Sequence, residues 1–240
     1  MASDFIIKAV GITLPIFLPV VSANLSSGLI IAGIAFVMTY VASEHRPFFL
    51  ISTAAAIFTC VFAFQSGLLT AILDEYQMNR IYAWIDPEEF PLSNGFQVLQ
   101  GLYAIGAGGL FGTGLGNSLQ KLGFLPEAQN DMIFSIICEE LGLIGAGFII
   151  LLFLILIWRF FVISTKASDL LGALIAAGAM AHMMIQVILN IAVVTNSIPN
   201  TGITLPFISY GGTSVVFLLL EMGLVLSVSN YEGLRYGGSE

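Results

Sequence analysis

The chain has 240 residues, of which 58% are hydrophobic and 9% are charged, and its formal net charge is −8. Soluble proteins carry roughly 25% charged residues, so this composition, with a mean hydropathy of +0.97, excludes a soluble core and indicates a membrane protein with several spans. The acids gather between Asp74 and Glu140 while the basic residues are few and scattered, which argues against nucleic acid as a partner.

Apolar stretches that predict membrane-spanning helices recur along the chain. We expect about six of them, which predicts an all-α integral membrane fold in one polytopic domain. They lie near residues 5–21, 29–42, 48–69, 132–158, 170–194 and 213–228. The first could also be a signal peptide, because Val21-Ser22-Ala23 resembles a cleavage site, but Asp4 and two prolines favour a retained helix.

A long polar segment, residues 74–131, separates the third and fourth expected spans and predicts an extramembrane loop. Within it, Phe96–Leu110 is too short and too rich in glycine to cross a bilayer comfortably, so a surface-lying or re-entrant helix is expected. The following run, Gly108–Gly116, lacks the strand context and the Lys-Ser/Thr ending of a phosphate-binding loop. Close backbone packing is the better interpretation of these glycines.

The loop returns to the fourth span through a proline. Pro126 fixes its own φ and disfavours helix in the residue before it, so a helix is expected to begin after Ala128. Asn130 or Asp131 would then cap the exposed N–H groups of its first turn. Asp131 is thereby expected at the start of a membrane helix.

Polar side chains also occur inside the expected spans. The carboxylates of Glu139 and Glu140 must face protein or water, either as a buried polar patch or as catalytic groups. His182, Gln186 and Asn190 recur every fourth residue and form one stripe on a helix. Such a stripe is typical of hydrogen bonding between membrane helices.

The basic residues predict the orientation of the chain. Arg80 and Lys121 fall on the side of the long loop. Five of the seven basic residues fall on the opposite side, namely Lys8, Arg46, Arg159, Lys166 and Arg235. By the positive-inside rule, that side and both termini are cytoplasmic, and the loop 74–131 and the compact loop 196–212 lie outside.

Several motifs, in order along essentially the whole chain, resemble the FtsW/RodA/SpoVE (SEDS) family of the bacterial plasma membrane. They are Tyr76-Gln77 with Arg80, Asp86-Pro87, Gly101–Gly116, Leu125-Pro126-Glu127 with Asp131, Glu139-Glu140-Leu141-Gly142, and Pro206–Gly212. The resemblance implies the C-terminal portion of a ten-helix fold, with no counterpart of the first four helices. A truncated sequence, a split gene with a separate amino-terminal half, and a remnant would all give this pattern. The family's PExHTD motif keeps its acid as Asp131 here, while its His and Thr are replaced.

The resemblance implies a peptidoglycan glycosyltransferase that polymerises lipid II, a polyprenyl-diphosphate-linked disaccharide peptide, in cell elongation, division or sporulation. A class B penicillin-binding protein and membrane lipids are the expected partners. Asp131 would be the catalytic general base, removing the proton of the acceptor sugar's 4-hydroxyl as the diphosphate leaves. Candidate substrate-binding residues are Arg80 and Lys121, which could balance the diphosphate charge, and Tyr76, Gln77, Glu127, Ser209 and Tyr210.

Other readings of the same residues stay open. Each candidate binding residue could instead be a solvated or packing residue of its loop. A divalent metal could lie near the diphosphate, but the sequence gives no ligand set, and Cys60 and Cys138 show no metal-ligand spacing. A lipid II flippase or transporter would use the polar stripe and Glu221 as a path through the membrane. A non-catalytic scaffold of the cell-wall complex would need neither the path nor Asp131.

Overall fold

The computed structural model describes residues 24–43, 75–90 and 94–237, together with isolated residues between 15 and 58. Within these ranges all regular elements are helical. They are α2 (Leu25–Ala42), α5 (Glu75–Ile85), α6 (Asn94–Gly108), the short 3₁₀ helix η1 (Gln120–Leu122), α7 (Ile133–Lys166), α8 (Leu170–Val194) and α9 (Gly212–Gly237). The predicted spans near 5–21 and 48–69 lie outside the described residues, apart from those isolated positions.

Three of the described helices are long and apolar enough to cross a membrane: Ile133–Lys166, Leu170–Val194 and Gly212–Asn230. A shorter apolar helix, Ser26–Ala42, accompanies them. This confirms the all-α membrane fold predicted from the hydropathy of the sequence. α2 starts with a side-chain cap, in which Asn24 Oδ1 accepts from the backbone N–H groups of Ser26 and Ser27 at 3.0 and 3.2 Å.

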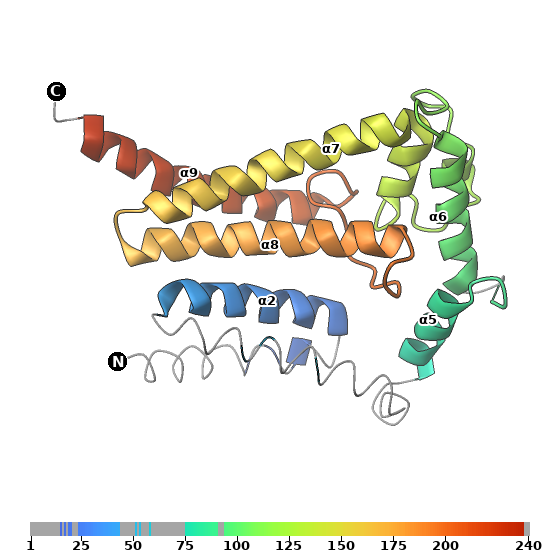
Figure 1. Ribbon diagram of the computed structural model, residues 1–240, viewed down its shortest axis with the longest axis horizontal. Coiled ribbons are helices and arrows are strands. Elements are labelled where there is room, and N and C mark those ends of the chain that lie inside the picture. Colours follow the sequence, from blue (N-terminus) through green and yellow to red (C-terminus); the bar gives the residue numbers. More distant parts are fainter. Residues whose placement is uncertain are drawn as a thin grey trace.

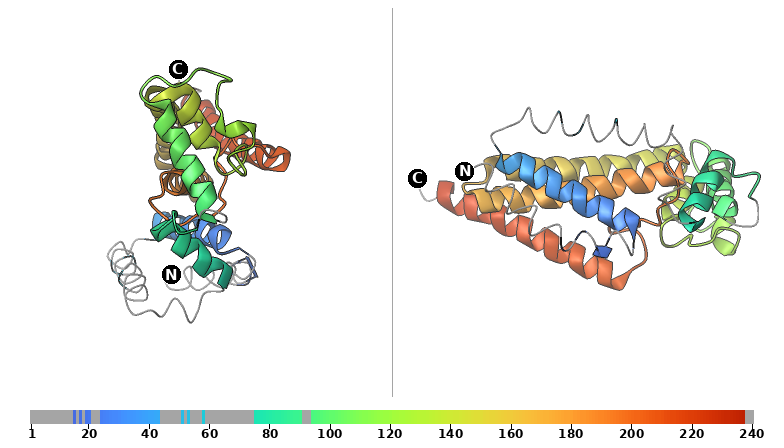
Figure 2. Two further views of the ribbon diagram at one scale, coloured as in Figure 1. Left: turned by 90° about the vertical axis from the view of Figure 1, so that its right-hand side faces the viewer. Right: turned by 90° about the horizontal axis from the view of Figure 1, so that it is seen from below.

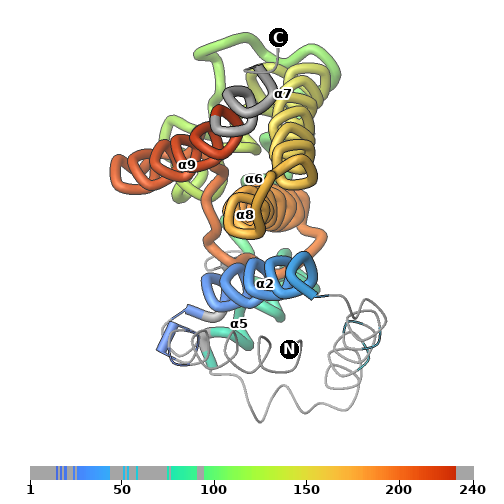
Figure 3. Tube along the Cα trace, turned by 90° about the vertical axis from the view of Figure 1, so that its left-hand side faces the viewer, coloured from blue at the N-terminus to red at the C-terminus, as the bar shows by residue number. Residues whose placement is uncertain are grey.

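Helix α8 lies at the centre of the described bundle, with α2 on one side and α7 and α9 on the other (Figure 3). Several of its inward positions hold small residues: Ala176, Ala177 and Ala181 are completely buried. Small side chains let neighbouring helices approach closely, which is how membrane helices gain packing contacts without a hydrophobic driving force between them.

Helices α5 and α6 lie at one end of the bundle, where α6 runs across the direction of α8 (Figures 1 and 2). α6 occupies the segment for which we expected a surface-lying or re-entrant helix, and it packs against the first part of α7. The first part of the loop between α8 and α9 lies at the same end, because α8 ends there and Asn196 and Asn200 bond to α5 (Figure 1).

Helix α7 is broken at Gly142, whose φ of 68° and ψ of −175° are not helical. Residues 133–141 lie beside α6, and the longer remainder turns back along α8 (Figure 1). A Cβ atom at Gly142 would collide with the backbone N of Gly112 and the carbonyl of Leu110. Glycine is required here both for the left-handed φ and for this close approach.

The segment 109–119, here called the glycine loop, satisfies the backbone groups freed by the break. In a continuous helix the N–H groups of Leu143 and Ile144 would donate to the carbonyls of Glu139 and Glu140. Instead, all four groups bond to the glycine loop: Leu143 N to Gly109 O (2.9 Å), Ile144 N to Leu110 O (3.2 Å), Thr113 N to Glu139 O (2.9 Å) and Gly114 N to Glu140 O (3.0 Å). The glycines therefore serve close backbone packing.

The expectation that Asn130 or Asp131 caps this helix is wrong. α7 begins at Ile133, its N-cap position is Met132, and no side chain makes a capping hydrogen bond. The preceding residues form turns in which Glu127 adopts a left-handed φ of 54°. These turns direct the Asp131 carboxylate toward α6, so it is not available to the first turn of α7.

Candidate active site

Asp131 lies in the turn immediately before α7 and is only 7% exposed. Its carboxylate faces Gln97 of α6, whose Nε2 lies 3.4 Å from Oδ1 and 3.5 Å from Oδ2. Burial raises the pKa of Asp131 from 3.8 to about 6, and the negative charge of Glu127 adds to this. A backbone hydrogen bond, the bond from Gln97 and the charge of Arg80 oppose the rise. A carboxylate with a pKa this close to neutrality can both lose and accept a proton under physiological conditions.

The backbone before α7 is held by three successive carbonyl contacts. The carbonyl of Gln129 accepts from Tyr210 N at 2.8 Å, and that of Asn130 accepts from the Ser209 hydroxyl at 2.7 Å. The carbonyl of Asp131 accepts from Asn190 Nδ2, also at 2.7 Å. We call residues 129–131 with these three partners the carbonyl latch.

Asn190 is the most deeply buried member of the carbonyl latch, with no exposed surface. Its Nδ2 also donates to the carbonyl of Ile203 at 2.7 Å, so one amide joins the Asp131 turn to the loop between α8 and α9. Gln186, one turn earlier, donates to the carbonyl of Thr204 at 3.0 Å. These two side chains of the polar stripe therefore bind loop backbone.

His182, the first residue of the stripe along the chain, makes the predicted hydrogen bond between helices. Its Nδ1 lies 2.9 Å from Glu221 Oε2, which joins α8 to α9. Both side chains line a pocket of about 350 Å³ whose other lining residues are mostly apolar residues of α2. Gln186 and Asn190 are not among the residues that line this pocket.

A second chain of polar contacts leads from Asp131 to α5. Gln97 Oε1 accepts from Asn200 Nδ2 at 2.9 Å, and the carbonyl of Asn200 accepts from Arg80 Nη1 at 3.0 Å. Trp84 Nε1 donates to the carbonyl of Asn196 at 2.9 Å and ties α5 to the same loop. These contacts fix Arg80 close enough to Asp131 for its positive charge to lower the pKa of that carboxylate.

The remaining candidate residues have different surroundings. Gln77 is half-buried on α5, and the side chain of Tyr76 lies outside the described residues. Tyr210 is 75% exposed, and Glu127 is exposed and accepts a hydrogen bond from Asn130 Nδ2. Ser209 is buried, and its hydroxyl also accepts from Leu205 N at 2.7 Å. This use of the hydroxyl within the protein favours a positioning role for Ser209.

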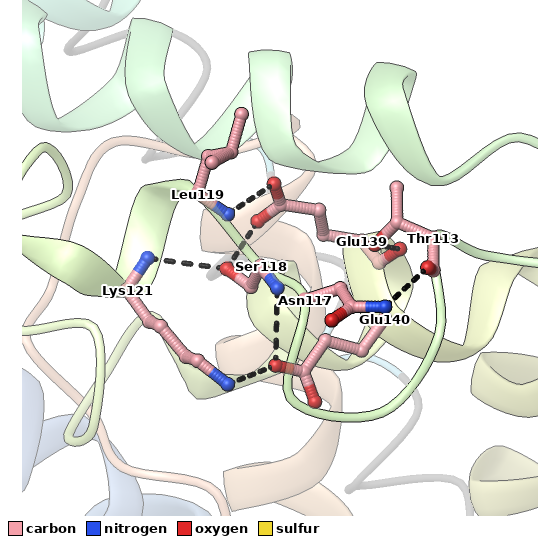
Figure 4. Close-up of polar contacts among 7 residues, drawn as sticks. All are labelled: Thr113, Asn117, Ser118, Leu119, Lys121, Glu139 and Glu140. Atoms are coloured by element: carbon pink, nitrogen blue, oxygen red, sulfur yellow. Dashed lines mark hydrogen bonds and ion pairs between the residues drawn. The ribbon is translucent and has the colours of Figure 1, made fainter.

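Glu139 and Glu140 bind the glycine loop through their side chains as well as their backbone (Figure 4). Glu139 is buried, and its carboxylate accepts from the Ser118 hydroxyl and, at 3.0 Å, from Leu119 N. Glu140 Oε1 lies 2.5 Å from Lys121 Nζ. Glu139 is thus part of a buried polar patch, whereas Glu140 is half-buried and is paired with Lys121, which we had expected at the diphosphate.

Gln97, Asn200 and the latch role of Asn190 were not foreseen. Gln97 is one of three amide side chains in α6, with Asn94 and Gln100, and the sequence does not distinguish it from the other two. Within the described ranges, no group of three or more His, Cys, Asp or Glu side chains is placed to hold a metal ion.

Comparison with known proteins decides the family. The sequence model of the FtsW/RodA/SpoVE family, described as a cell cycle protein, matches residues 1–233. The chain belongs to the FtsW/RodA/SpoVE family. It is 43% identical over 227 residues to stage V sporulation protein E of Bacillus subtilis, a match that covers 94% of this chain and 60% of that protein. It is 38% identical over 206 residues to a probable peptidoglycan glycosyltransferase FtsW of Trichlorobacter lovleyi, covering 86% and 52%.

Solved structures agree with this assignment. A chain of a peptidoglycan synthase complex that coordinates polymerization and crosslinking superposes with a TM-score of 0.69 and 28% identity, over 91% of this chain and 59% of that one. A mutant of the rod shape determining protein RodA of Thermus thermophilus shares the fold, with a TM-score of 0.58 and 23% identity. This SEDS chain is therefore a multi-pass bacterial membrane protein, and it spans 60% or less of the length of these relatives.

Proposed function

We propose that this chain carries the catalytic carboxylate of a peptidoglycan glycosyltransferase that polymerises lipid II, with Asp131 as general base. The observation that carries the proposal is the buried Asp131 carboxylate, whose pKa of about 6 lies far above that of an ordinary aspartate. Proton transfer is most effective when the pKa of the base lies near the working pH. Relatives named as probable peptidoglycan glycosyltransferases support the same reaction class.

In this reaction the acceptor sugar's 4-hydroxyl oxygen attacks the anomeric carbon of the lipid-linked donor. The new C–O bond forms on the face opposite the leaving diphosphate, so the anomeric configuration inverts. Asp131 removes the hydroxyl proton, and the bond between the anomeric carbon and the diphosphate oxygen breaks. The carbonyl latch holds the backbone of Asp131, which keeps the base in one position while the sugars bind.

Arg80 is the better placed of the two candidate cations for the departing diphosphate. Its charge already acts on Asp131, and a guanidinium suits the geometry of phosphate oxygens. Lys121 would first have to leave Glu140. Contact with the sugar or peptide stays a prediction for Gln77, Tyr76, Glu127 and Tyr210.

We propose the orientation in which α5, α6 and Asp131 lie outside and both termini lie in the cytoplasm. Support comes from the basic residues of the described helices: Lys166 and Arg235 stand at the ends of α7 and α9 that lie away from α6 (Figure 1). A cysteine placed at exposed Glu89 should react with an impermeant thiol reagent in intact cells, and one at Ser168 should not. The reverse labelling pattern would overturn the orientation.

A class B penicillin-binding protein is the proposed partner, by analogy with the peptidoglycan synthase complex to which the chain is similar. The flippase reading gains less support, because Gln186 and Asn190 are engaged with loop backbone and do not line the pocket beside His182. A separate amino-terminal half would supply the part of the relatives' length that this chain does not span.

The test is polymerisation of labelled lipid II by the purified chain, supplied with its partner and with the amino-terminal helices of stage V sporulation protein E. Asp131→Asn should lower the rate by about 10²–10⁴-fold, as expected for loss of a general base, and leave lipid II binding intact. Glu127→Gln also removes one carboxylate charge near the site, and it should lower the rate less than Asp131→Asn does. Near wild-type polymerisation by Asp131→Asn would refute the catalytic assignment and favour a scaffold.

A further inference from the structure

An apolar surface on the glycine loop and the turn after it has no role in the Asp131 site. Six large side chains are between 58% and 81% exposed: Leu110, Phe111, Leu115, Leu119, Leu122 and Phe124. We call these six residues the apolar rim. The only charged side chain among residues 110–124 is Lys121, which is paired with Glu140.

The break in α7 indicates the depth of this surface. Residues 143–166, at about 1.5 Å per residue, extend about 36 Å, which is enough to cross about 30 Å of hydrocarbon. Residues 133–141 are not needed for the crossing, and they lie beside α6 at the end of the bundle (Figure 1). Gly142 therefore lies near one boundary of the hydrocarbon layer.

Backbone hydrogen bonds fix the glycine loop at that same boundary. Gly109 and Leu110 accept from the first two N–H groups after the break, those of Leu143 and Ile144. The side chains of Leu143 and Ile144 are 56% and 59% exposed, and they begin the apolar outer face of α7. Only 17% of the apolar stretch of this helix is buried. The apolar rim is thus continuous with the exposed apolar face of a helix long enough to span a membrane.

We infer that the apolar rim inserts into the bilayer surface on the Asp131 side and contacts acyl chains just below the lipid headgroups. Transfer of large apolar side chains from water to this boundary region lowers the free energy. The loop's own backbone groups that bond to α7 need no water at that depth. Insertion would hold the glycine loop, and through Glu139 and Glu140 the start of α7, at a fixed height above the hydrocarbon.

Three alternative occupants would give an exposed apolar surface of this kind: a partner protein, a second copy of this chain, and the part of its longer relatives that this chain does not span. Lipid is favoured because the rim adjoins the outer face of α7 and is fixed to it by hydrogen bonds between 2.9 and 3.2 Å. A protein occupant makes a different prediction, since the rim would then be exposed to water until that protein is added.

The experiment places one additional tryptophan in the full chain and measures its contact with lipid. Leu115→Trp is compared with Glu89→Trp, a matched exposed position in the acidic connection between α5 and α6. Each variant is reconstituted into phosphatidylcholine vesicles with and without bromine on the upper acyl chain, and the emission of the parent, with Trp84 and Trp158, is subtracted. Vesicles containing this chain alone exclude a partner protein.

Brominated lipid should quench the tryptophan at position 115 about twofold or more and leave the one at position 89 nearly unchanged. A water-soluble quencher should give the opposite order. Equal quenching of both positions by the soluble quencher, with none by brominated lipid, would overturn the inference. Protection at position 115 only after addition of a penicillin-binding protein, or only at high protein density in the vesicles, would overturn it in favour of a protein contact.

Discussion

Asp131→Asn should make the folded protein more stable at neutral pH while removing its proposed activity. The pKa of Asp131 rises on folding from 3.8 to about 6, mainly because burial disfavours the charged form. Each pKa unit corresponds to about 1.36 kcal/mol, so ionised Asp131 lowers the free energy of unfolding by about 3 kcal/mol above pH 6. Asparagine has nearly the same size and can still accept from Gln97, but it carries no charge.

The sign of the effect follows from the direction of the shift. Because the folded-state pKa lies above the ordinary value, the folded protein binds the proton more tightly, and wild-type stability falls as pH rises from about 4 to 6. The assay is thermal unfolding in detergent, followed by the intrinsic fluorescence of Trp84 and Trp158, which can be read at pH 4 as well as at pH 7.5. Asp131→Asn should unfold several degrees above wild type at pH 7.5, and the two should converge near pH 4. An asparagine variant that is less stable than wild type at pH 7.5, or a difference independent of pH, would refute the reasoning.

Two further predictions concern the elements that hold Asp131. Gly142→Ala forces a Cβ atom onto Gly112 and a left-handed φ onto alanine, so it should lower the free energy of unfolding by about 1–3 kcal/mol or more. The control is Gly147→Ala, where a Cβ atom meets nothing within 4 Å, and it should be neutral or slightly stabilising in the same thermal assay. Asn190→Leu leaves two buried carbonyls without their donor and should cost about 1–3 kcal/mol for each; a melting temperature and polymerisation rate equal to wild type would show that the carbonyl latch is not needed.

The sequence predicted the helical membrane fold well, because runs such as residues 170–194 are apolar over the full length of a span. It also singled out Asp131, whose charge stands out where the loop returns to an apolar helix. The break at Gly142 could not be seen, since a single glycine inside a helical pattern does not by itself interrupt a helix. Its cause is the glycine loop, and such contacts between distant segments leave no periodic signal.

The same limit explains the errors around Asp131. A polar residue before an apolar run is typical of a helix cap, but tertiary contacts from Asn190 and Ser209 hold the turn in another conformation. The stripe of His182, Gln186 and Asn190 was interpreted as hydrogen bonding between helices, which is correct for His182 and wrong for Gln186 and Asn190, whose partners are loop carbonyls. Its spacing shows that the three side chains share a face, and the identity of their partners depends on how the loops fold over that face.

The measurement that tests the central claim most directly is the pH dependence of single-turnover polymerisation. If Asp131 is the general base, the rate should fall tenfold per pH unit below a pH of about 6. Glu127 raises the pKa of Asp131 and Arg80 lowers it. The acid limb of the pH–rate profile, where the rate falls, should therefore move to lower pH in Glu127→Gln and to higher pH in Arg80→Gln. Shifts in these opposite directions are predicted by direct electrostatic action on a titrating Asp131. A wild-type rate with no limb near pH 6, or a limb that neither substitution moves, would contradict the assignment.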